Sequence, residues 1–400
     1  MAITPITEID VSGRTLVIRA DLNAPMKEGE VSDATRIERF AAGLKPLLDS
    51  GARAVVLSHF GRPKGKPVPE MSLAPIAPVL AGALGQEVAF APDCIGAETE
   101  AMAKALKPGE AMLCENVRFH PGEEANDPAF AARLARLGDT YVNDAFSCAH
   151  RAHASTAAIA ALLPAYSGPM MDEETAALTA ALENPRHPAV AVVGGAKVSS
   201  KISVLKNLVN KVDSVIIGGG MANTFFFADG FNIGKSLCEE DQVDTVREIR
   251  ALAKAANCEL VLPSDIVYAF KFADNARSFI APLEDCPEDG IILDAGPKSV
   301  VRFRSVLANA QTILWNGPLG AFEIRPFEQA TKQLALEAAE LTRSGLVTSV
   351  AGGGDTVAAL NMAGVAEDFS YVSSAGGAFL EWLEGKTLPG LAALDRDKAA

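Results

Sequence analysis

AVAVV at residues 189–193 leads directly into GGAKVSSKI at residues 194–202. Its five residues are all apolar, which is typical of a parallel strand buried on both faces rather than of a half-exposed strand with alternating polar residues. Glycines after such a strand let a ligand approach the backbone closely, and a helix that starts there presents free N–H groups to anions. The stretch therefore predicts a strand, a ligand-binding loop and a helix, in that order.

Similar apolar runs recur along the chain and alternate with Ala-, Leu- and Glu-rich segments of helical spacing. We expect twelve strands, namely TLVIR (15–19), AVVLS (54–58), EVAF (87–90), AMLC (111–114), TYVND (140–144), AVAVV (189–193), SVIIG (214–218), LVLP (260–263), IILD (291–294), TILWN (312–316), LVTSV (346–350) and YVSS (371–374). Twelve parallel strands are too many for one sheet in a chain of 400 residues. The predicted fold class is α/β, with two Rossmann-like domains, each a mainly parallel sheet covered by helices on both faces, joined by a hinge.

The strand rhythm is interrupted at LPAYSGPMMDEETAAL (163–178), which we interpret as a Pro/Gly loop that runs into a helix. We expect a first domain at residues 1–170, a second domain at residues 171–375 and a separate C-terminal segment at residues 376–400. The stretch at residues 164–188, around this boundary, is the first hinge candidate, because domain boundaries fall where few contacts cross.

Composition and charge argue against several classes of function. The net charge of −14 disfavours a nucleic-acid partner or an anionic membrane partner, because either would need a basic face. The sequence has no apolar run long enough for a membrane span and no basic-then-apolar N-terminal pattern typical of a secretory signal. Its six cysteines occur singly, without a CxxC pair. Such thiols are expected to be inert and to lie in a reducing, cytoplasmic compartment.

In the first predicted domain, cationic side chains follow the strands. Because the carboxyl ends of parallel strands share one edge of a sheet, these side chains should gather where ligands bind. The residues concerned are Arg36, Arg62, Arg118, Arg151, His59, His150 and His153. Each one alone could be a solvated charge or a structural ring, but several guanidinium groups together match the oxygens of phosphate and carboxylate. We therefore expect a small, polyanionic ligand.

In the second predicted domain, glycines follow the strands instead. The loops are Gly194-Gly195-Ala196-Lys197, Gly218-Gly219-Gly220-Met221, Asn316-Gly317-Pro318-Leu319-Gly320, Gly352-Gly353-Gly354-Asp355-Thr356 and Ala375-Gly376-Gly377. Lys197 and Lys201 would share a helix face if the helix includes both. A single loop of this kind could be an ordinary turn, whereas five favour a nucleotide site.

Two standard nucleotide-binding patterns are missing from the sequence. No GxGxxG follows a strand, which counts against a dinucleotide-dependent dehydrogenase. The segment from Gly230 to Ser236 resembles a Walker A loop, but it is one residue short and does not follow a predicted strand. We therefore interpret this segment as structural.

Ten segments, in order along the whole chain, resemble the phosphoglycerate kinase family. They are RADLNAP (19–25), DATRIER (33–39), SHFGRP (58–63), ENVRF (115–119), NDAFSCAHRAHAST (143–156), GGAKVSSKI (194–202), GGGMANTF (218–225), WNGPLGAFE (315–323), AGGGDTVAAL (351–360) and SSAGGAFLEWLEGKTLPG (373–390). The resemblance implies a monomeric, hinge-bending enzyme of glycolysis and gluconeogenesis, which transfers a phosphoryl group between ATP and the carboxylate of 3-phosphoglycerate with Mg²⁺. It also implies that the chain after about residue 376 returns to the first domain.

The resemblance assigns roles to individual residues. Those that would bind 3-phosphoglycerate are Asp21, Asn23, Arg36, His59, Phe60, Gly61, Arg62, Arg118 and Arg151. Those that would bind the nucleotide are Gly195, Lys201, Gly219, Asn316, Glu323, Gly353, Gly354, Asp355 and Thr356, with Asp355 also binding Mg²⁺. Catalytic contacts to the transferred group would come from Arg36, Lys197, Lys201, Gly376 and Gly377.

The chain departs from the family pattern at a few positions. Ala20 and Ala24 stand where the family commonly has Val, and Glu173 stands where a Lys is common. The change at Glu173 concerns the coupling between domains rather than the chemistry. A rival interpretation, a non-catalytic anion-binding protein that closes on its ligand, leaves the glycine loops, Lys197 and Lys201 unexplained.

Overall fold

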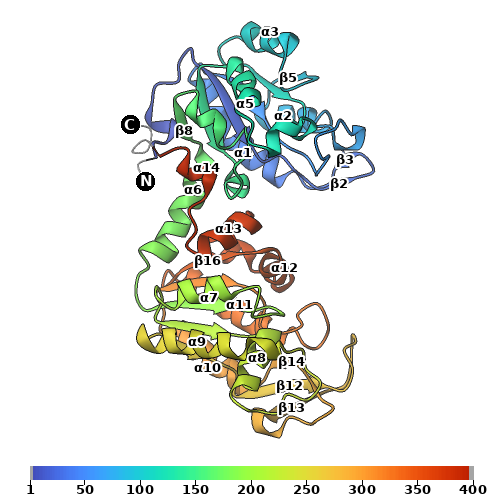
Figure 1. The fold of residues 1–400 in the computed structure, drawn as a ribbon, viewed down its shortest axis with the longest axis vertical. Helices are drawn as coiled ribbons and strands as arrows, with labels where there is room; N and C mark the ends of the chain where they lie inside the picture. Colours follow the sequence, from blue (N-terminus) through green and yellow to red (C-terminus); the bar gives the residue numbers. More distant parts are fainter. Residues whose placement is uncertain (1–2, 396–400) are drawn as a thin grey trace. The chain divides into compact units, whose positions relative to one another are not determined.

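The structure is a computed structural model and describes residues 3–395. The chain divides into two compact units (Figure 1). Within the described residues, one unit comprises residues 3–175 and 387–395, and the other runs from Ala176 to Lys386. The sequence prediction placed these divisions about five and eleven residues earlier. The first division falls inside a helix, and the residues after 376 join the first unit only from Thr387.

The first unit is built on a six-stranded parallel sheet with the strand order β5-β6-β4-β1-β7-β8. Its strands are β1 (Thr15–Ala20), β4 (Arg53–Leu57), β5 (Val88–Ala91), β6 (Ala111–Cys114), β7 (Thr140–Asp144) and β8 (Ala165–Ser167), and a small hairpin adds β2 (Met26–Lys27) and β3 (Glu30–Val31). Strand β8 corrects the prediction, because its three residues lie in the stretch interpreted as a loop. So short a strand gives no pattern that distinguishes it from a loop.

Helices cover both faces of this sheet, as predicted. The helices of the first unit are α1 (Thr35–Asp49), α2 (Ile76–Leu84), α3 (Ala97–Ala105), α4 (Pro121–Glu124), α5 (Pro128–Leu134) and α14 (Pro389–Ala392), and α6 (Pro169–Leu178) crosses into the second unit. Successive side chains of a strand point to opposite faces. Accordingly, Leu16 and Ile18 of β1 join the core that contains α1 and α2, whereas Val17 joins the core that contains α3 and α5.

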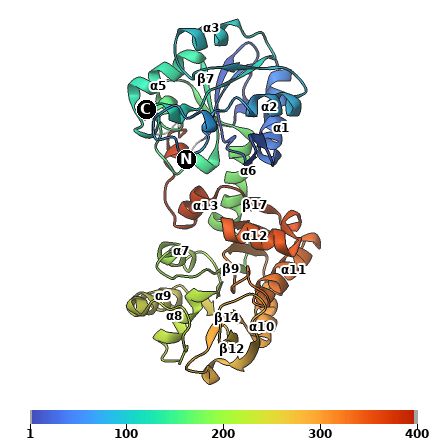
Figure 2. The same ribbon diagram turned by 90° about the vertical axis from the view of Figure 1, so that its right-hand side faces the viewer.

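The second unit has its own six-stranded parallel sheet, with the order β11-β10-β9-β15-β16-β17. Its strands are β9 (Ala189–Val193), β10 (Ser214–Ile217), β11 (Glu259–Val261), β15 (Thr312–Asn316), β16 (Thr348–Gly352) and β17 (Tyr371–Ser373). Its helices are α7 (Ile202–Leu208), α8 (Gly220–Ala228), α9 (Val243–Ala255), α10 (Pro297–Ala308), α11 (Gln329–Arg343), α12 (Gly354–Ala363) and α13 (Gly376–Leu383). Figure 2 shows α7, α8 and α9 on one side of this unit and α10, α11 and α12 on the other.

A three-stranded antiparallel sheet, with the order β13-β12-β14, completes the second unit. Its strands are β12 (Asp265–Ala269), β13 (Ser278–Pro282) and β14 (Ile291–Ala295). The prediction was wrong here, because it counted IILD among the parallel strands and missed β12 and β13. One apolar run cannot tell the direction of its partner, and β13 is partly exposed along its length, so it lacks the continuous apolar pattern.

Candidate active site

A small cavity of about 180 Å³ lies at the carboxyl edge of the first sheet, where the loops after β1, β4, β6 and β7 meet. It is lined by Asp21, Asn23, His59, Gly61, Arg62, Arg118, Ser147, Cys148, His150 and Arg151. Three guanidinium groups and two imidazole rings therefore face one small space. Its size and its cationic lining suit a compact anion.

Asp21 organises this cavity from the end of β1. Arg36, in the first turn of α1, places its Nη1 atom 2.8 Å from Asp21 Oδ2 and 3.3 Å from the Asn23 carbonyl oxygen. Ser147 also donates to Asp21 Oδ2. Burial alone would raise the pKa of Asp21, but His59 and Arg36 more than reverse this effect and lower the pKa. Asp21 is therefore a fixed anion that holds Arg36 beside the cavity.

The residues expected to gather around an anion are brought together with three exceptions, of which His153 is buried outside the cavity lining. Arg36 does not line the cavity itself but reaches it through Asp21. Phe60 is also outside the lining; its carbonyl oxygen accepts a hydrogen bond from Asn116 Nδ2 at 2.7 Å, and its side chain packs against the apolar core. Sequence reasoning missed Ser147 and Cys148, which were part of a quoted segment but had no assigned role.

A larger cavity of about 540 Å³ lies in the second unit. Most of its wall is apolar and includes Phe226, Leu237, Pro263, Ile266 and Phe272. Its polar edge includes Gly195, Gly219, Glu323 and Asp355, four of the predicted nucleotide-binding residues. A mainly apolar cavity bounded by glycines and carboxylates suits an aromatic base joined to a sugar and phosphates. The sequence did not predict the apolar wall, because its residues come from separate elements.

Further predicted residues form a hydrogen-bonded cluster beside this cavity rather than lining it. Lys201 Nζ donates to Asn316 Oδ1, and Asn316 Nδ2 donates to the Gly352 carbonyl oxygen at 2.8 Å. The Thr356 hydroxyl accepts from the backbone N–H of Gly317 at 2.8 Å. These bonds tie the loops after β15 and β16 together. Burial lowers the pKa of Lys201 to about 8, although Asp355 and Glu384 act in the opposite direction.

Three helices of the second unit begin in glycine loops, and one of them is α8, which begins at Gly220. Helix α12 begins at Gly354, so Gly354, Asp355 and Thr356 form its first turn, and helix α13 begins with Gly376 and Gly377. Free N–H groups at such ends attract anions. Lys197 and Lys201 do not form the expected pair on one helix face. Helix α7 begins only at Ile202, and both lysines precede it. Lys197 is exposed in the loop after β9.

The Walker-like segment follows helix α8 rather than a strand, which agrees with its interpretation as structural. The Ser236 hydroxyl accepts a hydrogen bond from the Ile292 N–H at 2.8 Å and so joins the segment to β14. Lys235 nevertheless lines the larger cavity. Its cationic side chain is therefore a contact to the cavity that sequence reasoning did not assign.

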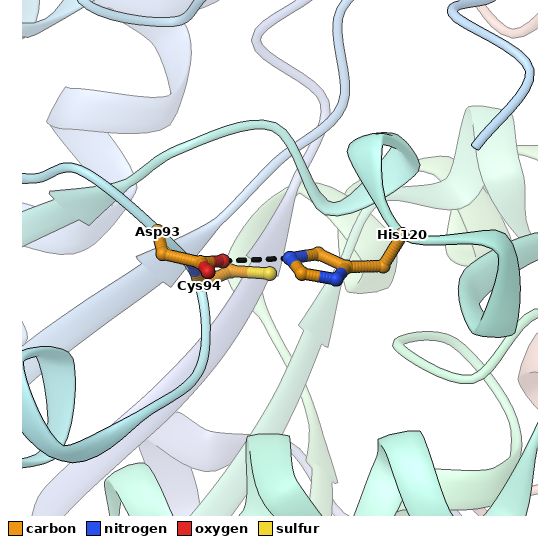
Figure 3. A group of neighbouring side chains, drawn as sticks. All are labelled: Asp93, Cys94 and His120. Carbon is orange, nitrogen blue, oxygen red and sulfur yellow. Dashed lines mark hydrogen bonds and ion pairs between the residues drawn. The ribbon is translucent and has the colours of Figure 1, made fainter. Parts of the chain in front are cut away.

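Asp93, Cys94 and His120 lie close together at the carboxyl edge of the first sheet (Figure 3). Their donor atoms fall within 4.8 Å of one another and would match Zn²⁺ by type. However, His120 Nε2 and Asp93 Oδ1 are already in hydrogen-bond contact at 2.7 Å. The Cys94 thiol is fully buried, and burial raises its pKa well above the usual range. We therefore interpret the group as structural: Asp93 and His120 already bind each other, and the Cys94 thiol is an inert part of the core.

Comparison with known proteins identifies the family. The model of a family described as phosphoglycerate kinase matches residues 6–386. This chain belongs to the phosphoglycerate kinase family. A phosphoglycerate kinase from Cereibacter sphaeroides is 57% identical over 389 residues, which are 97% of this chain and 98% of that protein. One from a Ruegeria species is 56% identical over 387 residues, with coverage of 97% and 98%.

Solved phosphoglycerate kinase structures share the fold. The structure of the enzyme from Coxiella burnetii is 43% identical, covers 100% of both chains and superposes with a TM-score of 0.93. That from Pyrococcus horikoshii is 29% identical, covers 98% of both chains and gives a TM-score of 0.79. Family membership identifies the chain as a kinase. It excludes the two other interpretations of the sequence, a dinucleotide-dependent dehydrogenase and a non-catalytic anion-binding protein. Within the described residues, no helix is long and apolar enough to cross a membrane.

Proposed function

We propose that this chain catalyses the reversible, Mg²⁺-dependent transfer of a phosphoryl group between ATP and the carboxylate of 3-phosphoglycerate. The observation that carries the proposal is the pair of unlike cavities. One unit has a small cavity lined by three arginines, and the other has a larger, mainly apolar cavity edged by glycine loops. The first suits a compact phosphorylated acid, and the second suits a nucleotide.

The acceptor requires no general base. A carboxylic acid with a pKa of about 4 is already ionised at neutral pH, so the nucleophile exists before it binds. The difficulty lies in bringing this anion to a polyphosphate. Catalysis in this site therefore consists of positioning and of covering the transferred oxygens with positive charge.

The positive charges and N–H groups proposed to surround the transferred phosphoryl group come from both units. Arg36 is held beside the first cavity by Asp21, and Lys197 and Lys201 stand in the loop after β9. The N–H groups of Gly376 and Gly377 at the start of α13 add fixed dipoles. In the proposed mechanism, these five residues contact the phosphoryl group as it moves. The remaining predicted residues bind the rest of each substrate.

Asp355 is the proposed ligand of Mg²⁺. Its carboxylate is exposed at the N-terminus of α12 and lines the larger cavity, so it can meet a cation that arrives with the nucleotide phosphates. Mg²⁺ prefers oxygen ligands and usually shares its coordination shell with phosphates and water. When bound, the ion would withdraw negative charge from the phosphate oxygens. Glu323, exposed at the edge of the same cavity, would accept from the ribose hydroxyls.

The two substrates bind to different units in this proposal, so transfer needs a hinge motion that brings them together. Closure would also exclude water, which would otherwise hydrolyse the acyl phosphate product. We further propose that the enzyme acts in the cytoplasm as a monomer. Among the described residues, all six cysteines are free, which suits a reducing compartment.

Asp355→Ala tests the metal assignment. The variant should bind MgATP at least about tenfold more weakly, because it loses a coordinating carboxylate. Calorimetric titration with ATP, at several Mg²⁺ concentrations, measures both affinity and its dependence on the metal. Asp368→Ala, which removes a carboxylate that pairs with Arg343 away from the cavity, is the matched control. Unchanged Mg²⁺ dependence in Asp355→Ala would remove this residue from the proposed site.

A further inference from the structure

A buried arginine lies behind the cavity of the first unit. Arg19, on β1, is fully buried and does not line the cavity. Its Nη2 atom is 3.1 Å from Nδ1 of His59, a ring that does line the cavity. A guanidinium group has only N–H donors and no acceptor. In this contact Arg19 must therefore donate, and His59 Nδ1 must accept.

The direction of this hydrogen bond determines the state of the ring. A neutral imidazole has one acceptor nitrogen and one N–H donor, so an accepting Nδ1 leaves the proton on Nε2. We propose that Arg19 is a positioning residue, which fixes His59 as the Nε2–H tautomer so that it presents a neutral N–H donor to the anion in the cavity. Where that anion is called 3-phosphoglycerate, the inference rests on the proposed function.

Arg19 is itself fixed by a buried network. Its Nε atom donates to Ser155 Oγ at 2.8 Å, and its Nη1 atom donates to the Ala20 carbonyl oxygen. Ser155 then donates its hydroxyl to Glu123 Oε1 at 2.5 Å and its backbone N–H to Oε2 at 2.9 Å. Glu123 is fully buried and supplies a negative charge near the guanidinium. Hydrogen bonds in three directions hold the planar guanidinium group of Arg19 in one orientation, which the flexible side chain of a lysine could not maintain.

The other groups that face His59 explain why the ring needs this partner. Asp21 Oδ1 lies 4.0 Å from Nδ1 and favours a protonated ring, and Cys148 Sγ lies 3.8 Å away. Arg118 and Arg151, which also line the cavity, disfavour protonation. Burial, followed by Arg19, lowers the pKa of His59 well below its usual range. Without Arg19, Nδ1 would face the Asp21 carboxylate, and an Nδ1–H or a doubly protonated ring would be favoured.

The tautomer can be tested without any substrate. Long-range ¹H–¹⁵N correlation spectra of the full-length protein at neutral pH distinguish an accepting Nδ1 from a protonated one. We expect His59 to show a protonated Nε2 and an unprotonated Nδ1. A signal from the Nδ1–H tautomer, or from a doubly protonated ring, would overturn the proposal whatever the protein binds.

Two substitutions of His59 test the consequence for binding while leaving Arg19 in place. The amide of Gln can place its NH₂ group where Nε2–H stands, whereas the amide of Asn reaches only to the position of Nδ1. We expect His59→Gln to keep the affinity for 3-phosphoglycerate within about tenfold and His59→Asn to lose at least about tenfold more. Equal losses in the two variants would count against an Nε2–H donor.

Arg19→Met tests the role of Arg19 itself. Loss of the Arg19 charge should raise the pKa of the His59 ring, so as the pH falls the ring of this variant should gain a proton at a higher pH than in the wild-type protein, and its affinity for 3-phosphoglycerate should rise. The double variant Arg19→Met/His59→Gln has no titrating ring and should lose this rise, while the titration of the ligand's own phosphate is common to both. Identical pH profiles of the two variants would contradict the proposal. Failure of the wild-type protein to bind 3-phosphoglycerate would instead refute the proposed function.

Discussion

Arg36 is the residue at which the geometry of the first unit and the proposed chemistry meet. We predict that Arg36→Ala lowers kcat by roughly 10³-fold, because it removes a cation from the transferred phosphoryl group. The fold should persist, because the pair with Asp21 is partly exposed and contributes about 1 kcal/mol at most. Steady-state kinetics and thermal unfolding measure both effects. Arg133→Ala, on the exposed side of α5, is the control, and near-normal turnover in Arg36→Ala would refute the catalytic role.

Lys201 should make nucleotide binding depend on pH. Its pKa of about 8 in the free protein lies below that of an ordinary lysine, so the side chain loses its proton as the pH rises through 8. Nucleotide phosphates favour the charged form, so binding above pH 8 should take up a proton and weaken as the pH rises. Calorimetry in buffers of different ionisation enthalpy measures this uptake. Lys201→Arg, which stays charged, should abolish it; proton uptake that persists in this variant would point to another group.

Among individual residues, motifs predicted the contacts that line a cavity better than those that lie behind it. Asp21, Asn23 and Arg118 were identified because they follow strands closely, in segments that the family shares. Arg19 was not identified, because inside the run TLVIR it is one residue of a strand. Its partner Ser155 is 136 residues away, and only the folded sheet brings the two together.

At the level of the loops, the close packing of one backbone against another should contribute more to stability than the positive φ of a glycine alone. Gly317 has φ of 111°, and a Cβ atom there would lie 2.2 Å from the Gly194 carbonyl oxygen. We predict that Gly317→Ala lowers the free energy of unfolding by more than about 3 kcal/mol and disrupts nucleotide binding. Gly364→Ala is the matched control, because Gly364 has φ of 73° but a Cβ atom there would meet no neighbour within 4 Å. Similar unfolding curves for both variants would show that packing between these loops is unimportant.

The elements that the sequence predicted are those with a continuous apolar pattern. All six strands of the second parallel sheet were expected, and the apolar run is clearest in β9, β10 and β15. Strands β8, β12 and β13 were missed for physical reasons. Strand β8 has only three residues and lies between Pro164 and Gly168, which favoured a loop, and the antiparallel strands do not have the fully buried pattern. The start of α7 was also misplaced, because a lysine pair four residues apart fits a turn as well as a helix.

For the whole molecule, the division of substrates between two units predicts a motion that needs both ligands. We expect the radius of gyration measured by small-angle X-ray scattering to fall when 3-phosphoglycerate and MgATP are both present, and to change less with either alone. Arg36→Ala should weaken this response, because it removes one of the positive charges proposed to contact the transferred phosphoryl group between the two substrates. A radius of gyration that stays constant in all four conditions would argue against closure of the two units.

The proposed activity requires both cavities to act together in one phosphoryl transfer. The most direct test mixes the purified protein with 3-phosphoglycerate, MgATP, NADH and a glyceraldehyde-phosphate dehydrogenase that consumes the product, and follows NADH absorbance. We predict NADH loss that requires every component and falls sharply in both Arg36→Ala and Lys201→Ala, one variant in each unit. No NADH loss from the folded protein, alongside a working positive control, would show that the two cavities do not carry out this transfer.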